Sequence, residues 1–319
     1  MGEKGSWCSA WLQLFCLLLV EAGAMLTYVE TMNSTKADSL HRHIKLLYEE
    51  NIRKAFELVV RDMLKKLKIC RCVIAIDTTK ELYWGKQGSL NVRGIKHERG
   101  ANEAFEWLVV SMVKPVPMTL MALPYRQGVD LATLTIELLR YVKSLKIHVD
   151  VALFDRAFYI GHLIDFLEAE RLNYLILVPE NERMKFYAEH TETIRAFKHV
   201  MNYDKDKSTW KPSTKIVVIK DVQKGDNKFD VFFATSLAAS MGLLRIYPKR
   251  WSIETVFRVM DEAKIKSKSN EHVIRYFYFM VQLLLHLAWN VHKQMIGYVQ
   301  FKRYLLGLIK LFSEEQGIT

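Results

Sequence analysis

The chain has 319 residues, of which 50% are hydrophobic and 25% are charged. This composition excludes an intrinsically disordered chain and is typical of a globular protein, and the length suits two or three domains. The net charge of +11 favours a polyanionic partner, although a solvated basic surface would give the same charge balance.

The first 68 residues are expected to form a helical amino-terminal domain. Apolar side chains recur at helical spacing at Leu40, Ile44, Leu47, Ile52, Phe56 and Val59. A helical unit of this kind is either a DNA-binding module or a plain packing subdomain. The pattern alone leaves both interpretations open.

Two apolar runs, at residues 7–20 and 276–289, are shorter than the roughly 20 residues that a membrane-spanning helix needs. The first run also resembles a secretory signal, because a lysine precedes it and small residues follow it. Nothing farther along the chain indicates export, so we expect two buried helices. We therefore expect no membrane partner and a cytoplasmic protein.

The four cysteines do not have the spacing of a zinc site or of an ordinary disulfide. They are Cys8, Cys16, Cys70 and Cys72. We expect buried free thiols in a reducing compartment.

Residues 69–179 are predicted to form the first part of an α/β domain. The expected elements are strands at 72–76, 105–113 and 118–123, a helix at 130–145, a strand at 149–154, a helix at 160–170 and a strand at 174–178. The first three strands are close enough in sequence for an antiparallel meander, and the later strands should be parallel. This order predicts an α/β fold with a ribonuclease H-like mixed sheet flanked by helices.

Residues 180–240 interrupt the alternation of strands and helices and are predicted to be a strand-rich insertion. Two apolar runs, at 216–222 and 229–235, flank a turn sequence at 224–227, which indicates a hairpin. Residues 241–319 return to a helical pattern. They are expected to complete the catalytic domain and to add carboxyl-terminal helices.

Two aspartates, Asp77 and Asp155, directly follow predicted buried strands. Ligands in open α/β sheets gather at the carboxyl ends of strands, so the two side chains are expected to lie close together. Neighbouring carboxylates repel each other unless a cation such as Mg²⁺ compensates their charge. For either aspartate alone, a turn or a helix cap is the other interpretation.

A third group of polar residues lies on the predicted helix that starts near Pro248. Tyr247, Arg250, Glu254 and Arg258 are three, four and four positions apart, so they are expected to share one face. The alternative interpretation is a surface ladder of ion pairs, which contributes little to stability.

These motifs together resemble the DDE transposases of the fourth insertion-sequence family and its relatives. Tyr247, Arg250 and Glu254 match the Y-x2-R-x3-E part of the Y-R-E-K signature, and residues 250–257 resemble the R-W-x-I-E-x-x-F run of these enzymes. Residues 76–79 resemble the first catalytic motif and residues 154–158 the second. The resemblance covers about residues 73–292, including the strand-rich insertion.

The resemblance implies an enzyme that cleaves DNA at element ends and joins them to target DNA. Asp77, Asp155 and Glu254 would be the catalytic residues and would bind two Mg²⁺ or Mn²⁺ ions per active site. Arg250 would bind a phosphate and Tyr247 would contact the backbone. The implied partners are the terminal inverted repeats and the target, both double-stranded DNA, and a second subunit in a synaptic homodimer.

The family pattern has a lysine seven residues after the glutamate, and this chain has Asp261 there. The candidates for the missing cation are Lys264, Lys266 and Arg258. Further DNA contacts are expected from Arg93, Lys96 and Arg99, which are predicted to lie in one basic loop.

Three other interpretations remain at this stage. The chain is alternatively a ribonuclease H-like nuclease or resolvase that cleaves without joining. A catalytically decayed transposase remnant would bind DNA without chemistry. A secreted or membrane-anchored protein is the third alternative.

Overall fold

The computed structural model describes residues 42–85, 88–201, 211–261, 267, 269–291 and 297–304. Our predictions for residues 7–20, Cys8, Cys16, Lys264 and Lys266 lie outside this part of the chain. The chain divides into two compact units. One is continuous, from Arg61 to Ile253, and the other combines Met1–Val60 with Glu254–Thr319.

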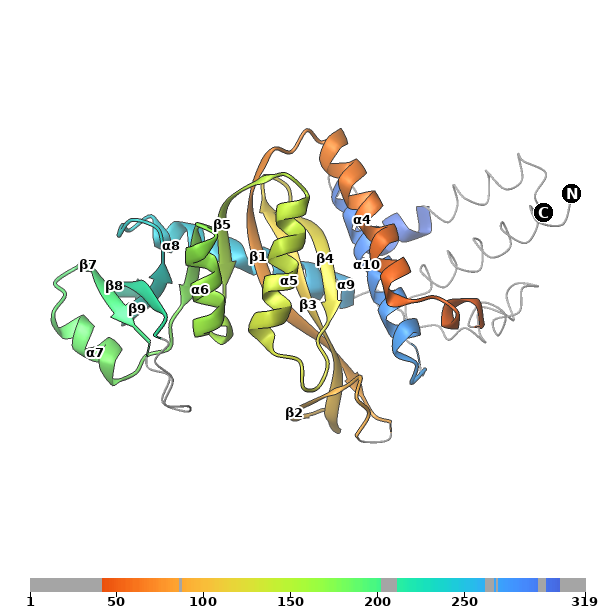
Figure 1. Cartoon of the computed structure of the whole chain (residues 1–319), viewed down its shortest axis with the longest axis horizontal. Coiled ribbons are helices and arrows are strands. Elements are labelled where there is room, and N and C mark those ends of the chain that lie inside the picture. The colour runs from red at the N-terminus through yellow and green to blue at the C-terminus, as the bar shows by residue number, and fades with distance from the viewer. Residues whose placement is uncertain are drawn as a thin grey trace, which may run out of the picture. The chain divides into compact units, whose positions relative to one another are not determined.

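The continuous unit is built on a nine-stranded sheet. Its strands are β1 (Arg71–Tyr83), β2 (Arg93–Glu98), β3 (Ala101–Lys114), β4 (Met118–Pro124), β5 (His148–Phe154), β6 (Tyr174–Leu177), β7 (Ile194–Val200), β8 (Ser213–Lys224) and β9 (Asn227–Thr235). They follow the order β2-β3-β1-β5-β6-β9-β8-β7, and β4 also pairs with β3 (Figure 1).

The central strands have the predicted directions. β1, β3 and β4 form an antiparallel meander, and β5 pairs with β1 in parallel. β6 pairs with β5 in parallel as well. The order β4-β3-β1-β5-β6 is that of a ribonuclease H-like sheet, so the predicted fold class is confirmed.

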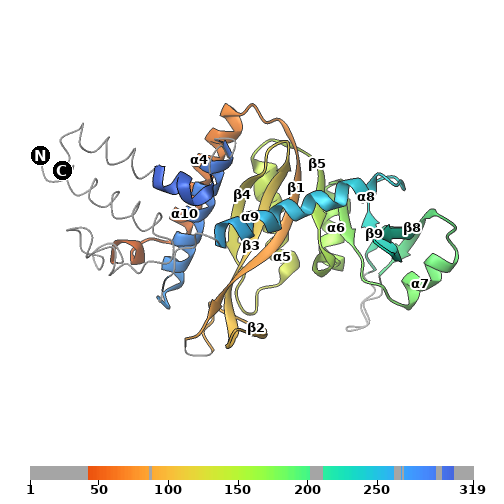
Figure 2. The same ribbon diagram turned by 180° about the vertical axis from the view of Figure 1, so that it is seen from behind.

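Helices cover both faces of this sheet. α5 (Leu131–Ser144) and α6 (Gly161–Ala169) follow β4 and β5 and lie on the face seen in Figure 1. α5 buries apolar side chains such as Leu138 and Val142, which lie four residues apart on one side of the helix. On the other face, seen in Figure 2, the helical run begins with α8 (Leu243–Ile246) and continues into η2 (Tyr247–Arg250), which contacts β1 and β5.

The strands of the predicted insertion belong to the same sheet. After α7 (Glu182–Glu189), β7, β8 and β9 form an antiparallel group, and β9 pairs with β6. The predicted hairpin is confirmed, because β8 and β9 meet at a two-residue turn between Lys224 and Asn227. Gly225 has φ +62° there, a left-handed conformation that glycine adopts without strain.

Two predictions for the sheet were wrong in detail. β1 does not end at Asp77 but continues to Tyr83, because β3 pairs with it along that length. The predicted basic loop is largely strand β2, which pairs with β3 across a tight turn at Arg99 and Gly100. Both turn residues have positive φ, at 48° and 81°, as a type I′ turn requires.

The second unit is helical in its described part. It contains most of α4 (Glu49–Lys66), all but the first three residues of α9 (Trp251–Asp261), and α10 (His272–Val291). α10 confirms the predicted core helix and buries the polar residues Gln282 and His286. Within the described residues, no helix is long and apolar enough to cross a membrane.

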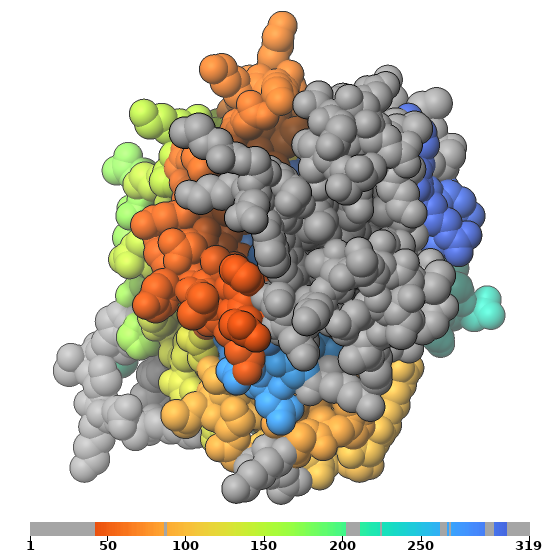
Figure 3. Space-filling model, turned by 90° about the vertical axis from the view of Figure 1, so that its right-hand side faces the viewer, coloured from red at the N-terminus to blue at the C-terminus, as the bar shows by residue number. Residues whose placement is uncertain are grey.

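α4 turns a slightly different side inward from the one that its sequence predicts. Ile52 and Phe56 are buried as expected, but Val60 is buried in place of Val59, which is 40% exposed. Leu58 is also exposed, and part of α4 lies on the surface shown in Figure 3. At its start, Glu49 lies 2.8 Å from His272 of α10, measured from Oε1 to Nδ1.

The two described cysteines are free thiols, as predicted, but only Cys72 is buried. Burial raises the pKa of the Cys72 thiol to about 12, because the thiolate would lose its hydration. Cys70 is exposed, which corrects the expectation that both are buried.

The N-cap of α5 gives a test of the local structure. Asp130 Oδ2 accepts hydrogen bonds from the Thr133 amide at 2.8 Å and from the Thr133 hydroxyl at 2.9 Å. We expect Asp130→Ala to lower the free energy of unfolding by about 1 kcal/mol, because an amide at the helix start loses its acceptor. Asp130→Asn keeps an acceptor and should retain most of the stability. Urea denaturation with unchanged m-values would measure both, and equal losses would contradict the capping role.

Candidate functional site

The parallel pairing of β1 and β5 brings the first two predicted site residues together. The register runs from Arg71 opposite His148 to Ile76 opposite Phe154, where the pairing with β5 ends. Asp77 and Asp155 are the next residues on the two strands. Because neighbouring strands lie about 4.8 Å apart, the two aspartates occupy adjacent positions just past the point where the pairing of β1 with β5 ends.

Asp77 is held by its own strand and by a cation. Its Oδ1 accepts a hydrogen bond from the Thr78 amide at 2.8 Å. Its Oδ2 lies 2.6 Å from Arg250 Nη1, in an ion pair with only 14% of the Asp77 and 9% of the Arg250 side chain exposed. The burial of this pair reduces solvent screening, so the two charges interact strongly.

Asp155 lies just past β5 and caps the short helix η1 (Arg156–Phe158). Its Oδ1 accepts a hydrogen bond from the Ala157 amide at 2.8 Å, so the helix-cap interpretation is correct for this oxygen. In the described part of the chain, Oδ2 has no hydrogen-bond partner. One oxygen thus fixes the carboxylate and the other remains available to a ligand.

Tyr247 and Arg250 come to the aspartates from η2 rather than from a regular α-helix. In a 3₁₀ helix, residues three apart lie on the same side, so both side chains point the same way. Both are buried, and the Tyr247 ring packs 5.1 Å from the ring of Phe233 in β9. The Arg250 guanidinium carbon lies 5.9 Å from the centre of the Tyr247 ring.

The charges of Arg250, Asp155 and Asp77 all act on the Tyr247 phenol. Burial raises the pKa of the Tyr247 phenol, Arg250 lowers it through its charge and a hydrogen bond, and Asp155 and Asp77 raise it. The net shift is upward from a value that already lies near 10. Tyr247 therefore keeps its proton at neutral pH and acts as a hydrogen-bond donor rather than a base.

The third predicted carboxylate, Glu254, is exposed in the first turn of α9, and Arg258 is exposed in its last turn. Both belong to the helical unit, whereas Asp77 and Asp155 belong to the sheet unit. Within the described residues, no group of three or more His, Cys, Asp or Glu side chains is arranged to hold a metal ion. The part of Glu254 in a metal site stays a prediction.

The other predicted DNA-binding residues lie in the hairpin of β2 and β3, and they differ in their exposure and contacts. Lys96 and Arg99 are exposed. Arg93 is engaged within the fold, because its Nε lies 2.9 Å from Glu106 Oε2 and its guanidinium stacks 3.7 Å from the Tyr125 ring centre. It also donates to the carbonyl of Arg126 at 3.2 Å. These contacts favour a structural role for Arg93.

Asp155 and the η2 residues lie within one region that matches a known protein family. Residues 128–284 match the family model of the transposase DDE domain. The chain carries a transposase DDE domain. The match includes Asp155, Tyr247, Arg250 and Glu254, whereas Asp77 precedes it.

Comparison with solved structures finds Argonaute of Marinitoga piezophila, crystallised with a 5′-hydroxyl guide RNA and target DNA. The sequence identity is 13% and the TM-score 0.22, over 60% of this transposase-domain chain and 26% of the Argonaute chain. This chain thus spans about a quarter of that protein. No match to a curated protein sequence was found.

The Arg250–Asp77 ion pair gives a test of the transposase-domain site that does not depend on activity. Arg250→Met should lower the free energy of unfolding by about 3 kcal/mol, because it leaves a largely buried carboxylate without its cation. In an Asp77→Asn background the same change should cost at least about 1 kcal/mol less. A double-mutant cycle in denaturant measures this coupling.

The pair Lys80–Glu98 is a matched control. Its charged atoms also lie 2.6 Å apart, but the side chains are 40% and 42% exposed. We expect a coupling of about 0.2–1 kcal/mol for this solvent-screened pair. Equal couplings for the two pairs would contradict the effect of burial at Arg250.

Proposed function

We propose that this chain is a DNA transposase that cleaves element ends and transfers the freed strands into target DNA by cut-and-paste transposition. Asp77, Asp155 and Glu254 are its proposed catalytic and metal-binding carboxylates. The observation that carries the proposal is the register of β1 and β5, which sets two aspartates side by side beside Arg250 and Tyr247. Membership of the transposase DDE domain family supports the DNA substrate.

The two aspartates fit hard divalent ions. Both supply carboxylate oxygens, the ligands that Mg²⁺ and Mn²⁺ prefer, and each has one oxygen fixed by a backbone amide. When bound, two such ions would activate the attacking hydroxyl and stabilise the leaving oxygen. The fixed oxygens keep both carboxylates in a defined orientation before any ligand arrives, which limits reorganisation during the reaction.

Arg250 and Tyr247 are proposed to hold the DNA backbone at this site. Arg250 has several donor groups and a permanent charge, so it can bind a phosphate as well as Asp77. Tyr247 keeps its proton and donates a hydrogen bond from its buried position. A phosphodiester at the aspartates therefore meets two donors next to it, which position the bond to be cut.

The remaining parts of the proposal follow from the transposase resemblance. Terminal inverted repeats and target DNA are the proposed double-stranded partners. Synapsis of two ends requires two active sites, so a homodimer is proposed. A cytoplasmic, nucleoid-associated location is the one expected for such an enzyme.

The decisive experiment measures Mg²⁺- or Mn²⁺-dependent cleavage and joining of DNA that carries the flanking ends of the element. Wild type should perform both steps. Asp77→Asn, Asp155→Asn and Glu254→Gln should each lower the rate at least about a hundredfold, because metal-assisted charge stabilisation contributes several kcal/mol. Asp226→Asn removes a carboxylate from the β8–β9 turn and is the matched control with wild-type rates.

The other outcomes separate the competing functions. Metal-dependent cleavage without joining would identify a resolvase-like nuclease. DNA binding without chemistry in wild type would identify a decayed transposase. Wild-type rates in Glu254→Gln would remove this residue from the catalytic set.

The unusual Asp261 gives a further test. This residue is exposed at the end of α9, where the related transposases have a lysine. We expect Asp261→Lys to strengthen binding to the element ends several-fold, because it replaces a repulsive charge by a cation that can contact a phosphate. Asp261→Asn separates the loss of repulsion from the gain of a contact. Unchanged affinity in both variants, measured by fluorescence anisotropy, would show that this position does not meet DNA.

A further inference from the structure

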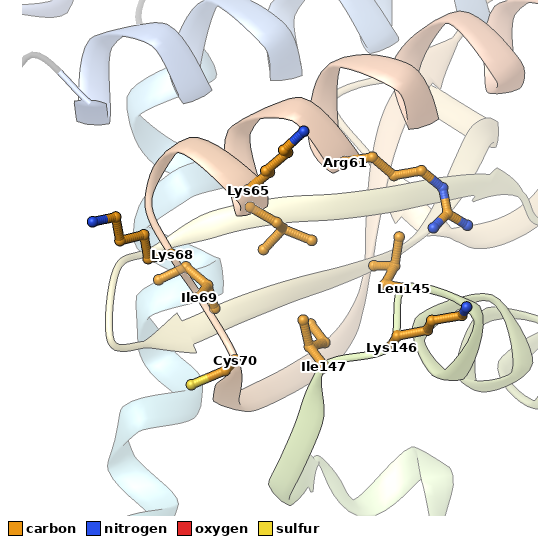
Figure 4. A pocket seen from close by; sticks show the side chains of 9 residues that line it. Arg61, Lys65, Lys68, Ile69, Cys70, Leu145, Lys146 and Ile147 are labelled. Atoms are coloured by element: carbon orange, nitrogen blue, oxygen red, sulfur yellow. The ribbon is translucent and has the colours of Figure 1, made fainter.

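A pocket with a basic rim lies at the opposite end of the β1–β5 pair from the two aspartates (Figure 4). It has a volume of about 390 Å³. Apolar side chains, Leu64, Ile69, Leu145 and Ile147, form its floor, and Arg61, Lys65, Lys68 and Lys146 surround them. Four cations lie around one hollow, and its lining contains no acidic residue. This charge favours the binding of an anion.

Two of the lysines occupy backbone positions that normally favour glycine. Lys68 follows the end of α4 with φ 52°, and Lys146 follows the end of α5 with φ 58°. A left-handed conformation is costly for a residue with a Cβ, and helices commonly end on glycine there. A cation near the carboxyl end of a helix is favourable. This does not explain why Lys68 and Lys146 themselves adopt the left-handed backbone conformation.

The rim lysines are available to a ligand. Lys65, Lys68 and Lys146 are exposed, and in the part of the chain that the structure describes none of them has an ion-pair partner. Arg61 has a different task, because it donates to the Ser144 carbonyl at 3.2 Å and to the Ser144 hydroxyl at 3.0 Å. It thereby joins the ends of α4 and α5 and fixes the width of the pocket.

The position of the pocket separates it from the proposed catalytic site. Ile69 and Cys70 lead into β1, and Ile147 leads into β5, whereas Asp77 and Asp155 lie where the pairing of the two strands ends. The six residue steps of β1 from Arg71 to Asp77 span about 20 Å. This distance corresponds to about six base-pair steps of a duplex, so a phosphate in the pocket is not the one that is cut.

We infer that this basic pocket binds the phosphate backbone of double-stranded DNA away from the cleavage site. The choice of DNA as the ligand rests on the proposed function, and the overall charge of +11 agrees with it. The contact reads no base, because lysine side chains at the rim reach phosphates rather than base edges. It holds DNA that lies outside the scissile position and adds to affinity rather than to the chemical step.

The test compares two triple variants of the full chain that remove the same net charge from the same two helices and their ends. The pocket variant combines Lys65→Gln, Lys68→Gln and Lys146→Gln. The control variant combines Lys54→Gln, Lys66→Gln and Lys143→Gln. The control lysines lie beside Glu50, Asp62 and Glu170 at 3.5, 2.7 and 2.5 Å, so a neighbouring carboxylate already compensates their charge.

Fluorescence anisotropy with a labelled duplex of random sequence gives the affinity at several salt concentrations. The pocket variant should bind about tenfold more weakly, and its slope of log K against log salt should fall by about one for each lysine that contacts a phosphate. The control variant should stay within about twofold of wild type. The inference would be overturned if the pocket variant had wild-type affinity and slope, or if both variants lost affinity equally. An acidic protein segment would then be the next ligand to test.

Metal-dependent nicking of a supercoiled plasmid at saturating protein separates this inference from the proposed function. The pocket variant should nick at the wild-type rate, because it lacks no group at the cut. Absence of nicking in wild type together with weaker DNA binding in the pocket variant would reject the proposed function and keep the pocket. Nicking in wild type with unchanged DNA binding in the pocket variant would support the proposed function and reject the pocket as a DNA-binding site.

Discussion

The ion pair between Arg250 and Asp77 is the interaction on which the arrangement of this site depends. The parallel register of β1 and β5 brings two carboxylates to adjacent positions, which their mutual repulsion opposes. Arg250 compensates part of that charge at 2.6 Å. Because η2 contacts both strands, the same pair also fixes the helical segment to the face of the sheet.

In the proposed transposase, a metal ion at Asp77 would compete with Arg250 for the same carboxylate oxygens. A divalent ion at Asp77 brings more charge than Arg250 does, and it leaves the guanidinium able to turn toward a phosphate. Arg250 contacts the Asp77 carboxylate, and under the proposed function it would exchange this partner for a phosphodiester of the same sign. This exchange gives a physical reason for a buried arginine beside an acidic site, where a hydrophobic residue would pack more simply.

The sheet was largely predictable from the sequence, because its buried strands are continuous apolar runs and its helices alternate with them. The hairpin at 224–227 was predictable from its glycine. Strand β2 was not, because its residues do not alternate between apolar and polar, and its turn at Arg99 and Gly100 lacks the usual Asn-Gly or Asp-Gly signal. The true end of β1 was also hidden, since β3 extends its pairing beyond Asp77 through tertiary contacts.

The sequence indicated that Asp77, Asp155, Tyr247 and Arg250 would lie near one another, but it did not predict their geometry. Spacing alone placed Tyr247 and Arg250 on an α-helix, whereas Pro248 lies at the start of a 3₁₀ segment that buries both. The basic pocket gave no sequence signal, because its lysines are separated by about 80 positions and meet only through the pairing of β1 with β5.

The pairing of β9 with β6 has a consequence for attempts to shorten this protein. β6 is a four-residue apolar strand, Tyr174–Leu177, enclosed between β5 and β9. Excision of the segment that carries β7, β8 and β9 would turn β6 into an open, uncharged sheet edge. Such an edge pairs readily with another chain, so a minimal version of the domain would gain a route to aggregation together with its smaller size.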